Sequence, residues 1–265
     1  MWTTTRIGPA PFLAVDHAGS GPLCVFLHGI GGNRRNWPDN LPAFAAHFHA
    51  VALDNRGYGD SDDYDGPLDY ADFAADVVRV IDHFGAARAH LVGLSMGGRV
   101  AAEVFARFPK RVDRLVLADT HLGFANLSDA ERAEFVRLRR DPLLAGREPR
   151  DIAEPVARSL SGPNITPEAF GKLVDSISRL HKESYIKTIE SSVANDRADL
   201  YAPITVPTLV VVGAHDPLTP PAMAREIAAR IAGARLHVIE DAGHLSNIEQ
   251  PEAFNRVVLE FLRSR

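Results

Sequence analysis

Residues 93–97 read Gly-Leu-Ser-Met-Gly, a G-x-S-x-G pattern that lies between two contrasting stretches of sequence. The apolar run Ala89–Val92 precedes it and is typical of a buried β-strand, whereas Met96–Phe108 follows with the pattern of a helix. In this context a serine sits on a sharp, strained turn, and its hydroxyl projects above the sheet. Glycine at 93 and 97 removes the Cβ atoms that would collide in such a turn. The pattern therefore predicts that Ser95 is a nucleophile.

The same alternation of strand and helix extends over most of the chain. Short apolar runs predict strands at Leu23–Leu27, Ala50–Leu53, Ala89–Val92, Arg114–Ala118, Thr208–Val212 and Leu236–Ile239. Helical patterns separate or follow them at Trp37–Phe48, Tyr70–Phe84, Met96–Phe108, Pro221–Ile231 and Pro251–Leu262. Several strands are apolar on both faces, as strands covered by helices on both sides must be. The sequence therefore predicts an α/β fold with a doubly wound, mostly parallel sheet.

Residues 123–200 interrupt this rhythm, because helical segments follow one another there without a convincing strand. The sequence Ser-Asp-Ala-Glu at 128–131 is typical of a capping box, and Thr-Pro-Glu at 166–168 indicates a second helix start. We expect residues 1–122 and 201–265 to form one core. Residues 123–200 then form a helical cap that is inserted into this core and lies over the sheet.

Composition and charge indicate which classes of binding partner can be expected for this chain. The chain has 265 residues, of which 46% are hydrophobic and 24% charged, and its formal net charge is −5, so we expect no nucleic-acid partner. No apolar run approaches the roughly 20 residues that cross a bilayer, and no basic-then-apolar leader is expected, so we predict no membrane association. The single cysteine, Cys24, cannot form an internal disulfide, which favours a cytoplasmic location. Its apolar neighbours favour a buried thiol over a nucleophile.

A glycine-rich loop follows the first core strand. Residues 28–32 read His-Gly-Ile-Gly-Gly, and such a loop lets the backbone approach a substrate closely. Acyl transfer needs two N–H groups aimed at the oxygen that becomes negative. We expect these donors to be Ile30, in this loop, and Met96, directly after the serine. A dinucleotide site would need glycine at the position of Arg34, so we expect no such cofactor.

Two further residues complete a candidate triad in the chain order Ser, Asp, His. Asp216 follows the strand at Thr208–Val212, and His244 lies on the loop after Leu236–Ile239, so both are expected at the carboxyl edge of the sheet. In this interpretation His244 is the general base and Asp216 orients it. Asp119 also ends a strand and is the alternative acid.

The other histidines carry less specific signals. Among the 11 histidines, His215 and His121 are weaker candidates for the base, and His28 is expected to brace the glycine-rich loop. No cluster has the spacing of metal ligands, so we expect no metal. Candidate substrate contacts are Gly29, Arg34, Trp37, Phe124 and Tyr185, because an arginine binds carboxylates and aromatic side chains line apolar pockets.

Five motifs extend the argument to a family. They are HGIGG at 28–32, DNRGYGDS at 54–61, GLSMGG at 93–98, GAHDPLTP at 213–220 and AGHLSNIEQP at 242–251. With them the chain resembles the α/β-hydrolase superfamily over essentially its whole length. Within this superfamily it looks most like 3-oxoadipate enol-lactonases and related small esterases. Those lactonases usually carry serine where this chain has His28, so the sequence departs from their pattern at the start of the glycine-rich loop.

The resemblance implies a cofactor-free hydrolase of a small carboxylic ester or lactone, with an acyl-enzyme on Ser95. Relatives that cleave carbon–halogen bonds or open epoxides need a carboxylate nucleophile, which serine at 95 disfavours. Two alternatives remain: a carbon–carbon bond hydrolase of vinylogous diketones with the same triad, and a ligand receptor with a slow triad. The expected partner is a small molecule, and whether the chain forms homo-oligomers stays open.

Overall fold

A computed structural model describes residues 2–124, 127–194 and 197–264. Within these residues eight strands form one sheet in the order β1-β2-β4-β3-β5-β6-β7-β8. The strands are β1 (Thr3–Ile7), β2 (Leu13–Ala18), β3 (Leu23–Leu27), β4 (His49–Leu53), β5 (Ala89–Leu94), β6 (Val112–Ala118), β7 (Thr208–Gly213) and β8 (Arg235–Ile239). From β4 to β8 all neighbouring strands are parallel, whereas β2 pairs antiparallel with both β1 and β4. The predicted α/β, mostly parallel sheet is therefore confirmed.

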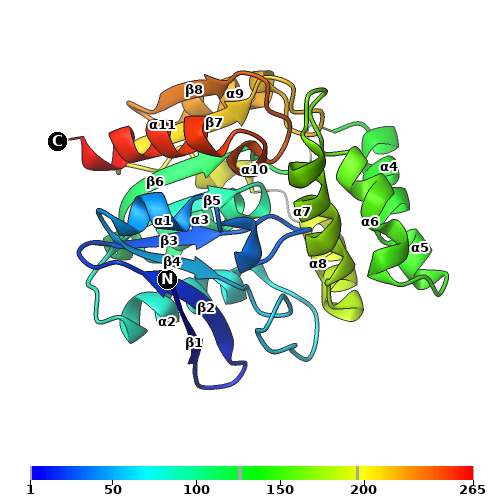
Figure 1. The fold of residues 1–265 in the computed structure, drawn as a ribbon, viewed down its shortest axis with the longest axis horizontal. Helices are drawn as coiled ribbons and strands as arrows, with labels where there is room; N and C mark the ends of the chain where they lie inside the picture. Colours follow the sequence, from blue (N-terminus) through cyan, green and yellow to red (C-terminus); the bar gives the residue numbers. More distant parts are fainter. Residues whose placement is uncertain (1, 125–126, 195–196, 265) are drawn as a thin grey trace.

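Helices cover both faces of this sheet (Figure 1). They are α1 (Leu41–Ala45), α2 (Tyr70–His83), α3 (Met96–Arg107), α9 (Pro221–Arg230), α10 (Ser246–Glu249) and α11 (Pro251–Arg263), with short 3₁₀ turns at Arg34–Asn36, Pro109–Arg111 and Ala198–Leu200. Helices α2 and α3 contact each other, as do α1 and α11. β3, β5 and β6 lie at the centre of the sheet and are almost wholly buried, which explains why both of their faces are apolar.

Between β6 and β7 the described residues form five helices. They are α4 (Asp129–Arg139), α5 (Asp141–Leu144), α6 (Pro149–Arg158), α7 (Pro167–Ser178) and α8 (Lys182–Ala194), and we call them the helical insertion. They stand together at one end of the sheet (Figure 1). The capping box at the start of α4 is confirmed, since Ser128 and Glu131 cap each other reciprocally. Thr166 caps α7, as the sequence predicted.

The insertion is joined to the core loop that precedes α10. The backbone N–H of His244 donates to the carbonyl of Leu160 at 2.9 Å. The Glu249 carboxylate accepts hydrogen bonds from the N–H groups of Gly162 and Gly243, both at 3.0 Å. Because both partners are glycines, the two backbones approach so closely that a Cβ on Gly162 would lie 2.7 Å from the nitrogen of Gly243. This junction fixes the loop that carries His244 against the insertion.

The predicted helix at Trp37–Phe48 is wrong in extent. The structure has a 3₁₀ turn at Arg34–Asn36, and α1 starts only at Leu41, with Pro42 in its first turn. Proline has no N–H to donate, so a helix starts there more easily than it continues through it. The antiparallel strands β1 and β2 were not predicted.

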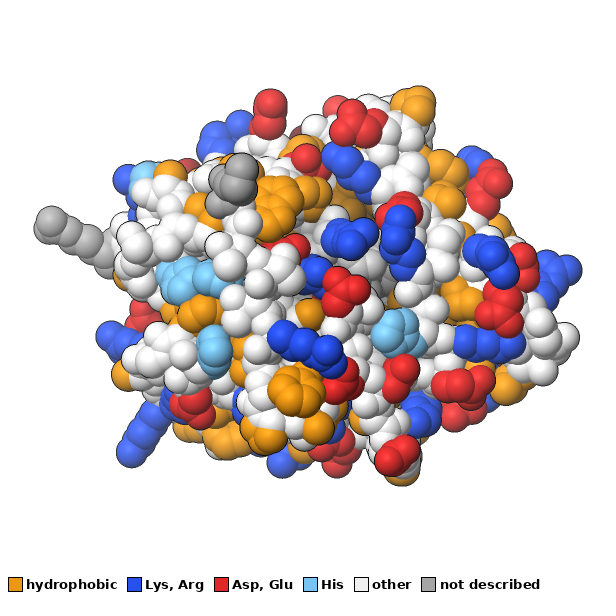
Figure 2. Space-filling model, turned by 60° about the horizontal axis from the view of Figure 1, so that its bottom comes forward, with side chains coloured by type: hydrophobic (Ala, Val, Ile, Leu, Met, Phe, Trp, Pro, Cys, Tyr) orange, Lys and Arg blue, Asp and Glu red, His pale blue; other side chains and the backbone are white. Residues whose placement is uncertain are grey.

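Two further observations concern the surface and the single thiol. Figure 2 shows Lys and Arg side chains interspersed with Asp and Glu across one face of the molecule. No helix in the described ranges is both long and apolar enough to cross a bilayer. Cys24 is buried in β3, and burial raises the pKa of its thiol, so it stays protonated.

Candidate active site

Ser95 occupies the turn between β5 and α3 with a backbone conformation that is rare for a serine. Its φ is +54° and its ψ is −117°, a combination that costs energy and is typical of functional sites. A Cβ on Gly93 would overlap the carbonyl oxygen of Gly97, and a Cβ on Gly97 would overlap the carbonyl of Leu27. A Cβ on Gly98 would lie 2.8 Å from Thr120. The close approach predicted from the glycines is therefore present, and α3 packs directly against neighbouring strands.

The structure brings His244 and Asp216 to this serine. His244 Nε2 lies 2.9 Å from Ser95 Oγ, and His244 Nδ1 lies 2.9 Å from Asp216 Oδ2. The Asp216 carboxylate also accepts hydrogen bonds from the N–H groups of Leu218 and Thr219, both at 2.8 Å, and from the Thr219 hydroxyl at 2.5 Å. These bonds fix the carboxylate, which in turn fixes the ring of His244. All three side chains of the predicted triad are thus within direct hydrogen-bonding reach.

Burial and the contact between His244 and Asp216 have opposing effects on the pKa values of these two side chains. Burial alone would lower the pKa of His244, but the Asp216 carboxylate outweighs it and the net pKa is raised. Burial alone would raise the pKa of Asp216, but His244 and the hydrogen bonds from Thr219 bring it below its usual value. Asp216 is therefore a carboxylate at neutral pH, and it stabilises an imidazolium beside it.

Asp119, the alternative acid, makes other contacts. Its carboxylate accepts hydrogen bonds from the N–H of Gly213 at 2.8 Å and from the N–H and hydroxyl of Ser246 at 3.2 and 2.6 Å. Burial, followed by the nearby charge of Asp216, raises the pKa of Asp119 to about 7. Of the two candidate carboxylates, the structure thus places Asp216, not Asp119, against the ring of His244.

The glycine-rich loop passes beside Ser95. A Cβ on Gly29 would lie 3.2 Å from the Cβ of Ser95, which is a tight contact, and 3.7 Å from its Oγ. Met96 is the first residue of α3, and its N–H is therefore one of the donors that a helix leaves without an internal partner. Ile30 and Met96 both line a cavity with Ser95. Both expected donors therefore belong to residues that share a cavity with Ser95.

His28 braces this loop as predicted. Its Nδ1–H donates to the carbonyl of Gly29 at 2.8 Å, and its Nε2 accepts the N–H of Asn55 at 3.1 Å. Burial lowers the pKa of His28, so the ring is neutral at physiological pH and has one donor and one acceptor for these contacts. His215 is exposed and lies outside the site.

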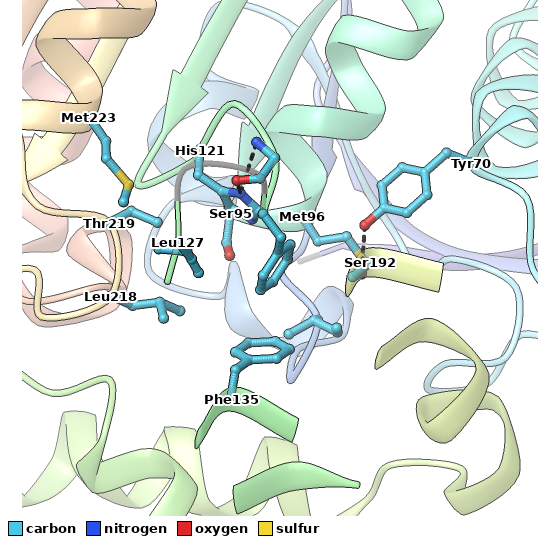
Figure 3. Close-up of a pocket in the computed structure, with 13 residues that line it drawn as sticks. Tyr70, Ser95, Met96, His121, Leu127, Phe135, Ser192, Leu218, Thr219 and Met223 are labelled. Carbon is cyan, nitrogen blue, oxygen red and sulfur yellow. Dashed lines mark hydrogen bonds between the residues drawn. The ribbon is translucent and has the colours of Figure 1, made fainter. Parts of the chain in front are cut away.

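Two cavities meet at Ser95, and both also contain Ile30 and Leu218. The further lining of the first cavity includes Tyr70, Met96, His121, Phe124, Phe135 and Met223. Figure 3 shows Ser95 and Phe135, which comes from α4, on facing sides of this cavity. The further lining of the second cavity includes Gly29, Arg139, Leu160, Leu173, Tyr185 and His244. Mostly apolar side chains therefore line the space on both sides of Ser95.

The sequence as a whole agrees with this arrangement. A model of the α/β-hydrolase fold family matches residues 22–251. The chain belongs to the α/β-hydrolase fold family. The resemblance inferred from the five motifs is therefore confirmed.

Several members of this family are similar over nearly their full length. The 3-oxoadipate enol-lactonase 2 of Acinetobacter baylyi is 31% identical, over 89% of this chain and 87% of that protein. The 2-hydroxy-6-oxononadienedioate/2-hydroxy-6-oxononatrienedioate hydrolase of Escherichia coli is 30% identical, over 97% of both chains. Among solved structures, the enol-lactonase from Burkholderia xenovorans matches with a TM-score of 0.85 and 29% identity, over 99% of this chain and 100% of that chain.

The prediction that Trp37 of this α/β hydrolase contacts the substrate is wrong. Its side chain is fully buried and lines neither cavity. The ring packs against Phe26 and Phe254, with centroids 5.0 and 6.2 Å away. The aromatic residue is therefore part of the core between the sheet and α11, which sequence alone does not distinguish from a pocket wall.

The expectation for Arg34 is also wrong. Its guanidinium forms ion pairs with Asp54, with Asp60 at 2.5 Å and with Asp16 at 3.1 Å, and it lines neither cavity at Ser95. Three carboxylates therefore already balance the positive charge of Arg34. Arg34 therefore fixes the chain just after the glycine-rich loop and faces neither cavity.

Other residues of the site were missed by the sequence analysis. Arg139 lies at the end of α4 and lines the second cavity, although neither its position nor its neighbours form a motif. Thr219 holds Asp216, and its neighbour Leu218 lies between the two cavities. The GAHDPLTP motif contained the only sequence signal for this pair. Gly29, Phe124 and Tyr185 line the cavities, as their expected role requires.

Proposed function

We propose that this α/β hydrolase cleaves a small carboxylic ester or lactone through an acyl-enzyme on Ser95. The proposal rests on one observation: His244 bridges Ser95 and Asp216 with two contacts of 2.9 Å, one from each ring nitrogen. A serine hydroxyl is a weak nucleophile unless a base removes its proton during attack. A neutral imidazole whose other nitrogen faces a carboxylate supplies that base.

The first half of the reaction forms the acyl-enzyme. Ser95 Oγ attacks the substrate carbonyl carbon while His244 Nε2 takes the hydroxyl proton. The resulting oxyanion accepts hydrogen bonds from the N–H groups of Ile30 and Met96, which are stronger in the transition state than in the substrate. His244 then donates its proton to the leaving oxygen, and the acyl group stays on Ser95. In a lactone, acyl group and leaving oxygen remain in one molecule.

The second half releases the acid. A water molecule loses a proton to His244 Nε2 and attacks the acyl carbon, and the same two N–H groups stabilise the second oxyanion. Collapse of this intermediate returns the proton to Ser95 Oγ. Asp216 stays ionised throughout, because it stabilises the transient charge on His244 without taking its proton.

Relatives support this chemistry at the level of ester-bond hydrolysis. Two of them carry the name enol-lactonase, which favours an enol-lactone or a small ester as substrate. A second candidate is hydrolysis of a carbon–carbon bond in a vinylogous diketone, favoured by the 2-hydroxy-6-oxononadienedioate hydrolase relative, which is 30% identical over 97% of this chain. Both reactions use the same nucleophile and base.

A covalent label and a substrate panel test the proposal. A fluorophosphonate should modify Ser95 once per chain, and Ser95→Ala should abolish labelling and lower kcat by roughly 10⁴- to 10⁶-fold. Ser192→Ala is the matched control, because Ser192 also lines the first cavity but bonds to Tyr70. Small aryl esters, enol-lactones and a vinylogous diketone then separate the two chemistries. Labelling at another serine, or near-normal turnover by Ser95→Ala, contradicts the proposal.

A further inference from the structure

Arg139 is a buried arginine in the same cavity as the proposed nucleophile. Only 3% of its surface is exposed, and it lines the second cavity with Ser95, His244 and Gly29. It is the last residue of α4 and therefore belongs to the helical insertion. Arginine is rarely buried without a partner, because removing its charge from water is costly.

The contacts of Arg139 leave its charge without an acidic partner. Its guanidinium donates two long hydrogen bonds to neutral oxygens, the carbonyl of Phe135 at 3.3 Å and the hydroxyl of Ser159 at 3.4 Å. It also lies 4.2 Å from the centre of the Phe135 ring, a favourable cation–π contact. Within residues 2–124, 127–194 and 197–264, no carboxylate lies within ion-pair distance of it.

Arg34 provides a contrast within the same chain. It is buried to a similar extent, but it forms ion pairs with Asp16, Asp54 and Asp60. Where a buried arginine has a structural role, as Arg34 does, nearby carboxylates balance the charge of its guanidinium. Arg139 has the fork of N–H donors that binds a carboxylate at two points, and it faces a cavity instead.

Tyr185 supplies a second free donor to this cavity. Its side chain is fully buried and lines the second cavity with Arg139, and its hydroxyl makes no hydrogen bond within the described residues. A buried hydroxyl without a partner is also costly, and a ligand that accepts its hydrogen bond removes that cost. A cation without an ion-pair partner and a hydroxyl without a hydrogen-bond partner, both in one cavity, point to an acidic acceptor that is missing from the protein itself.

We propose that Arg139 and Tyr185 bind a carboxylate group of the substrate, so that the enzyme selects anionic esters or lactones over neutral ones. This inference rests on the proposed function of Ser95 and names its substrate class. The carboxylate occupies the second cavity beside the guanidinium, and the scissile carbonyl lies at Ser95, where the two cavities meet. Binding energy from this remote group orients the carbonyl for attack.

Electrostatics inside the site agree with an anionic ligand. Burial lowers the pKa of Arg139, and the smaller opposing effects of Tyr185 and Glu134 do not offset it. The positive charge of Arg139 also acts to lower the pKa of His244. A bound carboxylate offsets both effects and favours the imidazolium that forms during attack.

Matched aryl esters measure this selectivity. The mono-4-nitrophenyl ester of adipic acid and 4-nitrophenyl hexanoate differ mainly in a carboxylate in place of a methyl group, and uncatalysed hydrolysis is subtracted for both. The readout is the ratio of kcat/KM for the anionic ester to kcat/KM for the neutral ester. Arg139→Gln should lower this ratio by about 10- to 100-fold, the usual effect of losing hydrogen bonds to a charged group. Tyr185→Phe should lower it about three- to tenfold.

Controls separate charge recognition from structure. Arg137→Gln removes a positive charge from the same helix, but Arg137 is exposed and pairs with Glu134, so the ratio should not change. Adipate should competitively inhibit hydrolysis of the neutral ester by wild type, which requires no substitution and covers the case that Arg139→Gln does not fold. An unchanged ratio in folded Arg139→Gln, or no inhibition by adipate, overturns the inference. The proposed function survives such a result if the fluorophosphonate still labels Ser95 and the enzyme still hydrolyses the neutral ester. Loss of both labelling and hydrolysis would refute the proposed function instead.

Discussion

The carboxylate of Asp119 holds Ser246 by two hydrogen bonds, one from the backbone N–H at 3.2 Å and one from the hydroxyl at 2.6 Å. Ser246 lies two residues after His244, and the other oxygen of Asp119 accepts the N–H of Gly213 at 2.8 Å. Asp119 therefore connects the end of β6 with the loop that carries the proposed base. It positions this loop without contacting the reacting atoms.

Substitution of the two carboxylates should separate their roles. Asp216→Asn should lower kcat by roughly 10⁴-fold, because the amide favours the wrong tautomer of His244. Asp119→Asn should lower kcat by only about tenfold, since it weakens a hydrogen bond that holds a loop. Steady-state kinetics on an aryl ester, with the melting temperature as a check of folding, measures both. The opposite ranking would move the orienting role to Asp119.

The pH profile gives an independent test of Asp119. The general base must be neutral, so activity should fall as the pH drops through the pKa of His244, which lies above 6.5. The Asp119 carboxylate contributes to raising that pKa, so Asp119→Asn should lower it and preserve activity to lower pH. The wild-type limb should also be broader than a one-proton titration, because Asp119 itself titrates at about 7.

Rate profiles of kcat/KM between pH 5 and 9 for wild type and Asp119→Asn measure this shift. Asp129→Asn is the matched control, since its carboxylate is almost fully exposed at the start of α4. A purely structural role for Asp119 predicts lower rates with an unmoved midpoint, and that result would contradict the electrostatic part of the prediction.

The turn around Ser95 should not tolerate added volume. A methyl group on Gly97 would overlap the backbone of Leu27, so Gly97→Ala should lower the free energy of unfolding by about 1–3 kcal/mol. Gly171→Ala is a control in the middle of α7, where a Cβ meets nothing within 4 Å. It should raise stability by about 0.5–1 kcal/mol. Urea denaturation of both variants gives the comparison, and equal stability would refute the packing argument.

Arg34 should prove important for stability and not for substrate choice. Arg34→Gln leaves the fully buried carboxylate of Asp54 without its ion pair, which should cost about 3–5 kcal/mol of unfolding free energy. The ratio of kcat/KM between anionic and neutral esters should stay unchanged in the folded fraction. Denaturation curves and the matched ester pair measure the two quantities. A changed ratio would return Arg34 to the substrate site.

Strands and turns could be predicted from the sequence where their local residue pattern has one physical explanation. Runs apolar on both faces, such as Leu23–Leu27, occur where helices cover both sides of a strand. The turn around Ser95 requires glycines at fixed spacing, so it too is visible in the sequence. β1 was missed because Thr3–Ile7 is largely exposed and polar, and an edge strand needs no apolar run. β2 was missed because its short apolar run at residues 13–15 is followed at once by Asp16 and His17.

Residues whose role depends on tertiary neighbours were not predictable in this way. Trp37 and Arg34 have side-chain chemistry that suits a pocket, but their neighbours place one in the core and the other among three carboxylates. Arg139 has several other arginines close to it in sequence, among them Arg137 and Arg140. Only the packing of α4 decides which of these is buried beside the cavity.

The glycine-to-glycine junction between residues 162 and 243 sets a rule for redesigning this protein. Replacing helices of the insertion with those of a relative alters the cavity walls, but residues 160–162 also hold the backbone of His244 in place. Chimeras should therefore exchange the segments on either side and keep Leu160 to Gly162 together with Glu249. With crossover points chosen in this way, a chimera changes substrate specificity without disturbing the position of His244. This is possible although cavity walls and the support of His244 come from one continuous stretch of chain.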